Sequence, residues 1–237
     1  HNIVDNFDRK DSFTDSPFLE NVRTEMVDYL KGSDTYVSLL ELNYYKQLNR
    51  NLYTKLSAGI FEQMYGGFGG EILYKPFDSN FSFSANIYNV KKRDYDQRFN
   101  FQEYQTETGH ITVSHYLPSL SMLSSISFGR YLANDSGFTF DFSRIFHNGG
   151  KAGFFFTLTD ISFREFGEGS FDKGFYFSFP LDIFSNNYNR NNTGFKLRPL
   201  TRDGGAKLEI NNTLLDIMHS SNMSELNQRY FWNEFLY

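Results

Sequence analysis

Apolar and polar residues alternate at every second position along much of this chain, and this restricts its fold more than any other feature. In Phe81–Tyr88 (FSFSANIY) the odd positions are apolar, and in Phe138–Ser143 (FTFDFS) phenylalanine alternates with threonine, aspartate and serine. Ile111–Ser114 (ITVS) repeats the pattern. A period of two places alternate side chains on opposite faces of a β-sheet. The sequence therefore predicts an all-β fold with one apolar and one polar face.

Turn-forming residues separate these stretches and predict antiparallel strands joined mostly by hairpins. The segment 22–30 fits a strand or a helix. The tail 222–237 is ambiguous in the same way, and we interpret it as a short C-terminal helix. We expect strands near 36–48, 52–62, 70–75, 80–91, 104–117, 121–132, 137–146, 151–159, 174–180, 193–198 and 205–215.

The aromatic content is unusual for so polar a chain. Phe, Tyr and Trp make up 19% of the residues, although the mean hydropathy is negative. No apolar run approaches the roughly 20 residues of a membrane-spanning helix. Aromatic residues on alternating positions are typical of strands that face lipid on one side and water on the other. We therefore expect an antiparallel transmembrane β-barrel of about 10–12 strands, with a soluble β-sandwich as the alternative.

The lengths of the connections agree with a barrel. Outer-membrane barrels have short turns at one end and long loops at the other. Short turns are predicted at 49–51, 76–79 and 147–150, and long polar connections at 92–103, 160–173 and 181–192.

Several classes of function are not favoured by the composition. The formal net charge is −5 and the basic residues are scattered, so nothing favours a nucleic-acid partner. The chain has no cysteine, which excludes disulfides, thiolate metal sites and cysteine nucleophiles. The five histidines show no metal-ligand spacing, and no G-x-S-x-G elbow occurs. We expect no metal, no cofactor and no catalytic serine.

The glycine-rich stretch Met64–Glu71 (MYGGFGGE) superficially resembles a phosphate-binding loop. Such a loop needs a lysine and a following helix, and here the lysine is absent and strands are predicted on both sides. Glycine also permits positive φ angles and close approach of neighbouring backbones. We interpret the stretch as a bulge or an inward bend of a strand.

Two charged segments that also contain glycine are the candidate functional elements: Phe163–Gly174 (FREFGEGSFDKG) and Arg198–Ala206 (RPLTRDGGA). Guanidinium groups bind carboxylates in bidentate fashion, and a water-filled barrel interior tolerates charge whereas its lipid-facing surface does not. We expect one internal charge network made of Arg164, Glu165, Glu168, Asp172, Lys173, Arg198, Arg202 and Asp203.

Two alternatives remain open for the polar segments. Paired carboxylates serve glycoside hydrolysis, so Glu165, Glu168 and Asp172 define a hypothetical hydrolase or modifying site. The predicted long loop around 92–103 mixes charges with aromatic rings, as sugar-binding surfaces do, although an ordinary solvated loop fits equally well. Its candidate sugar-binding residues are Arg93, Asp94, Tyr95, Asp96 and Tyr104.

Several motifs together resemble the YjbH/GfcD family of exopolysaccharide and capsule proteins of bacterial outer membranes. In chain order they are MYGGFGGE (64–71), RDYDQ (93–97), FGRYLANDSG (128–137), FGEGSFDKG (166–174) and RPLTRDGGA (198–206). The resemblance implies an outer-membrane β-barrel of a Gram-negative bacterium that takes part in production or export of an extracellular polysaccharide. It provides no catalytic residues, so the implied role is non-enzymatic.

The resemblance also bears on the extent of the chain and on its partners. Family proteins are longer, and this chain is similar to their C-terminal part, so we expect residues 1–237 to form one barrel domain of a larger protein. The implied partners are polysaccharide, outer-membrane lipids, polysaccharide-export lipoproteins, and the N-terminal remainder of the protein or a companion chain. A barrel that only scaffolds lipoproteins is a further alternative.

Overall fold

The computed structural model describes residues 19–32, 36–146, 150–161, 171–180, 192–197 and 203–220. Ten strands and two short α-helices make up these parts, together with one 3-10 turn. In chain order the elements are α1 (Met26–Gly32), β1 (Leu40–Asn49), β2 (Leu52–Ile60), β3 (Tyr65–Tyr74), β4 (Phe81–Arg93), β5 (Phe101–Leu117), η2 (Pro118–Leu120), β6 (Met122–Arg130), β7 (Ser136–Ile145), β8 (Lys151–Thr159), β9 (Asp172–Pro180), β10 (Asn192–Leu197) and α2 (Leu214–Ser220).

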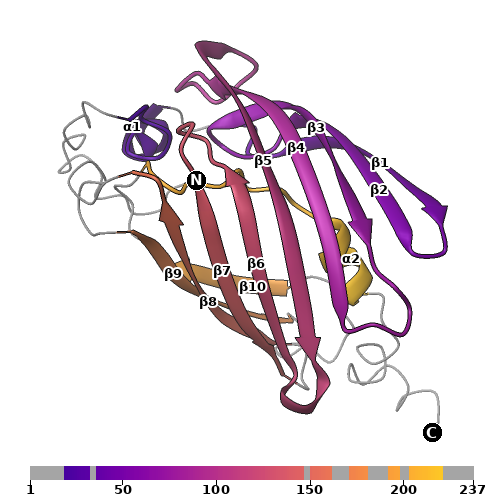
Figure 1. Cartoon of the computed structure of the whole chain (residues 1–237). Helices are drawn as coiled ribbons and strands as arrows, with labels where there is room; N and C mark the ends of the chain where they lie inside the picture. Colours follow the sequence, from indigo (N-terminus) through magenta and orange to yellow (C-terminus); the bar gives the residue numbers. More distant parts are fainter. Residues whose placement is uncertain are drawn as a thin grey trace, which may run out of the picture.

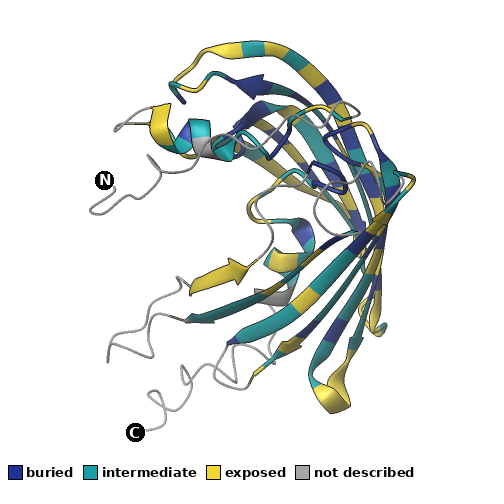
Figure 2. Ribbon diagram, turned by 90° about the vertical axis from the view of Figure 1, so that its left-hand side faces the viewer, coloured by how far each residue is buried: buried dark blue, intermediate teal, exposed yellow. Residues whose placement is uncertain are grey.

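All ten strands belong to one antiparallel sheet in which each strand pairs with its neighbour in sequence, from β1 to β10. The sheet curves strongly, and α1 and α2 lie on its concave side (Figure 1). The two edge strands, β1 and β10, do not pair with each other, so the described sheet is open (Figure 2). The all-β antiparallel prediction is confirmed, whereas the closed barrel is not observed in the described residues. A sandwich would need a second sheet, and the described strands form one.

The predicted strands agree well with those observed, with two informative differences. The segment 205–215 was expected to be a strand, but residues 206–210 form no ladder and Leu214 already begins α2. Within 22–30 the helical alternative is correct, because α1 begins at Met26. The predicted tail helix, 222–237, lies outside the described residues.

Nearly all of the glycine-rich stretch lies inside β3, and the bulge alternative of its prediction is wrong. Register with β2 and with β4 continues without a shift through Gly66–Gly70. The glycines permit close approach instead: a Cβ built on Gly67 would lie 2.1 Å from the carbonyl oxygen of Asn89, and one on Gly69 would lie 2.3 Å from the Tyr88 ring. A larger residue at these positions would collide with the next strand.

The two faces of the sheet are opposite to those of a water-soluble protein. Positions on the concave face are polar and buried, among them Lys55, Ser57, Glu71, Ser82, Thr106, Thr108, His110, Ser114, Ser127, Thr139, Ser143 and Thr157. Many positions on the convex face carry large, apolar and exposed side chains. We call them the outer belt: Leu42, Tyr44, Leu56, Phe68, Ile72, Tyr74, Phe83, Ile87, Ile111, Val113, Ile126, Phe128, Phe138, Phe154, Leu158, Phe175, Phe195 and Leu197.

Strand register makes the outer belt continuous across the sheet. Ile111 of β5 pairs with Phe128 of β6, which pairs with Phe138 of β7, and Phe138 pairs with Leu158 of β8. The rings of Phe128 and Phe138 are 4.7 Å apart. On β5 the belt ends before Glu107, which shares the convex face with Ile111 and is also exposed. The belt is thus an apolar band with a polar margin.

The predicted division into a short-turn end and a long-loop end holds for five of the six predicted connections: the short turns follow β1, β3 and β7 at one end, and two long connections follow β4 and β8 at the other. Since consecutive strands pair, connections alternate between the two ends of the sheet. The 181–191 connection of β9 and β10 is the exception, because it starts at the same end as the short turn Arg50–Asn51. The predicted long loop 92–103 is shortened to 94–100, because β4 reaches Arg93 and β5 begins at Phe101.

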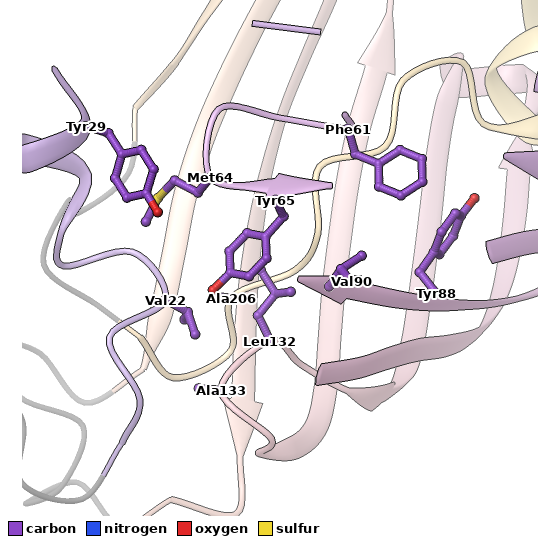
Figure 3. Packing of buried hydrophobic residues seen from close by; sticks show 10 residues of the cluster. All are labelled: Val22, Tyr29, Phe61, Met64, Tyr65, Tyr88, Val90, Leu132, Ala133 and Ala206. Carbon is purple, nitrogen blue, oxygen red and sulfur yellow. The ribbon is translucent and has the colours of Figure 1, made fainter. Parts of the chain in front are cut away.

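The apolar core of the described residues lies on the concave side near one end of the sheet. The segment before and within α1 contributes Val22 and Tyr29, and the C-terminal part contributes Ala206. They pack with side chains from the β2–β3 connection, β3, β4 and the β6–β7 turn (Figure 3): Phe61, Met64, Tyr65, Tyr88, Val90, Leu132 and Ala133. The core thus joins sequence-distant segments to the inside of the sheet. No helix in the described parts is long and apolar enough to cross a membrane.

Candidate functional site: a strap across the concave face

Residues 203–214 cross the concave side of the sheet from the β6–β9 region to α2 (Figure 1). We call this segment the strap. A buried backbone without a ladder must find other partners for its N–H and C=O groups. In the strap these partners are mostly charged side chains of the sheet, of its connections and of the segment before α1.

The first part of the strap is anchored at the β6–β7 turn. The Asp135 carboxylate accepts a hydrogen bond from the backbone N–H of Gly205 (2.7 Å), and the N–H of Leu132 donates to the carbonyl of Ala206 (3.0 Å). Gly205 has φ +69°, a left-handed conformation that favours glycine. A Cβ there would also lie 2.8 Å from the Thr157 side chain. The glycine therefore permits both the turn and the close packing.

An ion pair buried on both sides holds the middle of the strap. The Arg23 guanidinium binds the Glu62 carboxylate in bidentate fashion, at 2.7 and 2.9 Å, and both side chains are less than a tenth exposed. Arg23 also donates to the carbonyl of Lys207 (2.8 Å), and Glu62 accepts from the N–H of Glu209 (3.3 Å). Burial is the largest influence on Arg23 and disfavours the charged guanidinium, but the charge and hydrogen bonds of Glu62, together with Glu209 and Tyr65, outweigh it, so the pKa of Arg23 is raised. Burial also raises the pKa of Glu62, although Arg23 opposes this shift, and the strap orients both side chains.

The last part of the strap is fixed by two charges of opposite sign from β2 and β3. The Lys55 ammonium donates to the carbonyls of Asn211 (2.8 Å) and Asn212 (3.2 Å). The Glu71 carboxylate accepts from the N–H of Leu214 (3.0 Å), the first residue of α2. A carboxylate at a helix N-terminus also interacts favourably with the helix dipole.

The strap in turn orders the N-terminal described segment through Asp203. One oxygen of its carboxylate accepts hydrogen bonds from the backbone N–H groups of Val22 (2.8 Å), Arg23 (2.7 Å) and Thr24 (3.1 Å). The other oxygen accepts from the Thr24 hydroxyl (2.6 Å). Successive backbone N–H groups form an anion-binding nest, here occupied by the protein's own carboxylate.

The predicted charge network falls only partly on described residues. Arg164, Glu165, Glu168, Arg198 and Arg202 lie outside them. Asp203 is buried and accepts hydrogen bonds from the N–H groups of 22–24 and from the Thr24 hydroxyl. Asp172 is buried at the start of β9, beside Gly205 of the strap. Lys173 is exposed on the convex face, and its ammonium lies 4.8 Å from the centre of the Phe171 ring. Asp172 and Asp203 thus lie inside the sheet.

Of the candidate sugar-binding residues, Arg93 is fully buried. Its guanidinium donates to the backbone carbonyls of five residues that converge on the end of β4: Val37, Glu62, Gln63, Gln97 and Arg98. An arginine used in this way ties the β2–β3 and β4–β5 connections together. This arrangement gives Arg93 a structural role.

The other four candidates also make intramolecular bonds. Asp94 and Asp96 accept from nearby backbone N–H groups of the 94–100 loop. The Tyr95 hydroxyl donates to Glu25 (2.8 Å), whose carboxylate also pairs with Lys92 (2.6 Å). The Tyr104 hydroxyl, part of β5, donates to the carbonyl of Leu132 (2.6 Å). The Tyr95–Glu25 bond joins the 94–100 loop to the residue before α1, and sugar binding by the loop stays a prediction.

Sequence reasoning missed the charges that do hold the strap: Arg23, Lys55, Glu62, Glu71 and Asp135. Lys55 and Glu71 carried a detectable signal, because each is a charge at a strand position where the alternation requires an inward side chain. Arg23, Glu62 and Asp135 lie in connections, where charges are ordinary. No grouping of three or more potential metal ligands occurs in the described part of the chain.

Asp135 predicts a pH dependence of stability. Burial raises its pKa to about 6, although the Gly205 N–H opposes the shift. The folded protein therefore holds this proton more tightly than the unfolded chain. The free energy of unfolding should fall as the pH rises from about 4 to about 6, by on the order of 2 kcal/mol from this group. Asp135→Asn should flatten this part of the profile in denaturant titrations, whereas Asp78→Asn, an exposed turn substitution, should leave it unchanged. An unchanged profile in Asp135→Asn would contradict the assignment.

Comparison with known proteins gives the chain's relationships. The family model described as "Exopolysaccharide biosynthesis protein YbjH" matches residues 1–220. A protein of Escherichia coli (strain K12), named "Uncharacterized lipoprotein YjbH", is 39% identical over 215 residues, covering 87% of this chain and 30% of the relative. The chain thus spans less than a third of the length of that relative. No solved structure matches. With a family match over nearly all its length, this chain belongs to the YjbH family of exopolysaccharide biosynthesis proteins.

Proposed function

We propose that this chain is a non-catalytic, membrane-embedded β-barrel part of the bacterial outer membrane that takes part in export or surface organisation of an exopolysaccharide or capsule. The family description supports the link to exopolysaccharide, and the relative's name as a lipoprotein supports a location in the cell envelope. The observation that carries the membrane part of the proposal is the outer belt.

The outer belt is too extensive for a surface in water. Soluble monomers rarely expose continuous apolar patches larger than a few hundred Å². Here the apolar residues run from β1 to β10 along the convex face, while the polar side chains are buried on the concave face. This is the arrangement of a transmembrane barrel, in which strands alternate between lipid and a polar interior.

The two edge strands, β1 and β10, each lack a partner on one side in the described sheet, so the proposed barrel requires further strands. In hydrocarbon, unpaired N–H and C=O groups cost several kcal/mol each, so only closed barrels span membranes with strands. β1 and β10 must therefore pair with further strands. We propose three candidate sources of these strands: residues of this chain outside the described ones, the remainder of a longer protein such as the relative, or a companion chain.

The interior favours a role other than an open channel. The strap, the segment before α1 and α1 occupy the concave side, and their polar groups are bonded to the sheet. We propose that this filled interior organises polysaccharide, or the export machinery, and carries out no chemistry. Polysaccharide-export lipoproteins are the partners that this role requires.

Site-directed spin labelling tests the membrane part directly. Since the chain has no native cysteine, a single nitroxide is attached through Val113→Cys, in the outer belt, or through Glu107→Cys, six residues earlier on the same face of β5. In lipid vesicles the label at Val113 should collide mainly with dissolved O2, and the label at Glu107 mainly with a water-soluble nickel chelate. A label at Val113 that collides mainly with the nickel chelate would refute a lipid-facing belt.

A further inference from the structure

The concave face of β7–β10 carries a group of side chains that the strap does not use as anchors. We call it the inner aromatic patch: Tyr176, Phe155, Lys151, Lys196, Asp141 and Glu209. Glu209 belongs to the strap, and the other five project from four adjacent strands. Tyr176, Phe155, Lys151 and Asp141 are half-buried, and Lys196 and Glu209 are 44% and 48% exposed. The patch is therefore accessible in the described structure.

Both aromatic rings of the patch lie against the backbone of a neighbouring strand, above a glycine. A Cβ on Gly153 of β8 would lie 2.5 Å from Cζ of Tyr176, and one on Gly174 of β9 would lie 2.7 Å from Cε1 of Phe155. A ring that covers a glycine also stabilises the sheet. Both aromatic residues keep part of their surface exposed. The Tyr176 hydroxyl donates to Asp141 (2.9 Å), which fixes the position of that ring.

Positive charge is concentrated above these rings. The Lys151 ammonium lies 5.6 Å from the centre of the Tyr176 ring, and that of Lys196 lies 5.2 Å from the Phe155 ring. Lys196 also pairs with Glu209 at 3.5 Å. Lys207 adds a third cation: burial lowers its pKa to about 8, Asp141 opposes this shift, and Lys196 adds to it. Among described residues, neither Lys151 nor Lys207 makes an ion pair.

We propose that the inner aromatic patch binds acidic saccharide units, of the uronate type, within the exopolysaccharide that the proposed function places at this protein. The C–H face of a sugar ring carries partial positive charge and stacks on the negative face of an aromatic ring. A sugar carboxylate would form ion pairs with Lys151 and Lys207, and Asp141 and Glu209 would accept hydrogen bonds from hydroxyl groups. This inference rests on the proposed function, which it makes more specific.

The test measures binding of tetragalacturonate to the purified full chain in lipid nanodiscs by calorimetry. The double variant Lys151→Gln with Lys196→Gln should weaken binding about tenfold or more, which corresponds to about 1.4 kcal/mol. Tyr176→Leu should also weaken it, whereas Tyr176→Phe keeps the ring and should have a smaller effect. The matched control is Lys46→Gln with Lys91→Gln, which removes the same charge from the opposite face of the sheet and should leave the affinity unchanged.

Three results would overturn the proposal: no binding of tetragalacturonate by a folded chain, equal affinity for neutral maltotetraose, or equally tight and Lys151-dependent binding of tripolyphosphate. The last result would identify a general anion site. Folding of each variant is checked by its gel mobility with and without boiling. The spin-label measurement at Val113 does not involve sugar, so a chain that passes it and fails to bind tetragalacturonate overturns the patch and leaves the membrane barrel standing.

Discussion

Ile111→Arg is expected to lower the free energy of unfolding of the membrane-embedded chain by about 2–4 kcal/mol, the cost of a cation on the lipid face of a barrel near mid-bilayer. Ile111 is 65% exposed and lies in the outer belt on the central strand β5. In water, replacing so exposed a side chain would change stability by less than about 0.5 kcal/mol. The substitution therefore separates a lipid-facing from a water-facing convex surface.

The measurement is urea unfolding in lipid vesicles, followed by the loss of β-sheet circular dichroism. Gln105→Arg is the matched control, because Gln105 lies on the same face of β5, beyond the polar margin of the belt, and is exposed. It should change stability by less than about 0.5 kcal/mol. If Ile111→Arg and Gln105→Arg destabilise the chain equally little, the outer belt does not face lipid.

Arg23→Met is expected to destabilise the folded chain by about 3–5 kcal/mol, because it leaves the Glu62 carboxylate buried without its charged partner. The loss should be concentrated in the strap, since Arg23 also binds the carbonyl of Lys207 and Glu62 binds the N–H of Glu209. Denaturant titration measures the total effect. Hydrogen exchange of the Glu209 amide measures the local effect, and its exchange should accelerate most.

A double-mutant cycle distinguishes the ion pair from simple loss of packing. In Arg23→Met with Glu62→Met no uncompensated charge remains, so the double variant should be more stable than Arg23→Met alone. Lys196→Met removes a cation from the exposed pair with Glu209, which should be worth less than about 1 kcal/mol. Equal losses from Lys196→Met and Arg23→Met would contradict a special role for the buried pair.

Most of the sheet could be predicted because its signal is local. In β4, β5 and β7 each residue contributes to a period of two, and turn residues mark where each strand ends. The segment around Ala206–Ile210 misled the prediction for the same reason: Leu208 and Ile210 alternate with Lys207 and Glu209, as in a strand. The backbone partners of Lys207 and Glu209 are the side chains of Arg23 and Glu62, more than a hundred residues away, and no local pattern encodes them.

A network of charges inside the sheet could be predicted from the sequence, but most of the residues that form it could not. Charges were expected to pair inside the sheet, and Asp203 does lie there. Its partners include the backbone N–H groups of Val22 and Arg23, whose proximity depends on how the segment before α1 docks. Glycines in Met64–Glu71 suggested a bulge, but they permit close strand contact instead, and sequence alone does not distinguish these uses. Contacts that form only because the sheet curves cannot be predicted from the spacing of residues in the sequence.

The strap also imposes an order on assembly. Each hairpin joins residues that are near in sequence, so the sheet can grow strand by strand at a small entropic cost per step. The bond from Val22 to Asp203 spans 181 residues and that from Leu214 to Glu71 spans 143, so these contacts require the curved sheet to exist first. A chain whose synthesis stops late could thus have nearly all its strands and still lack the strap that fills their concave side.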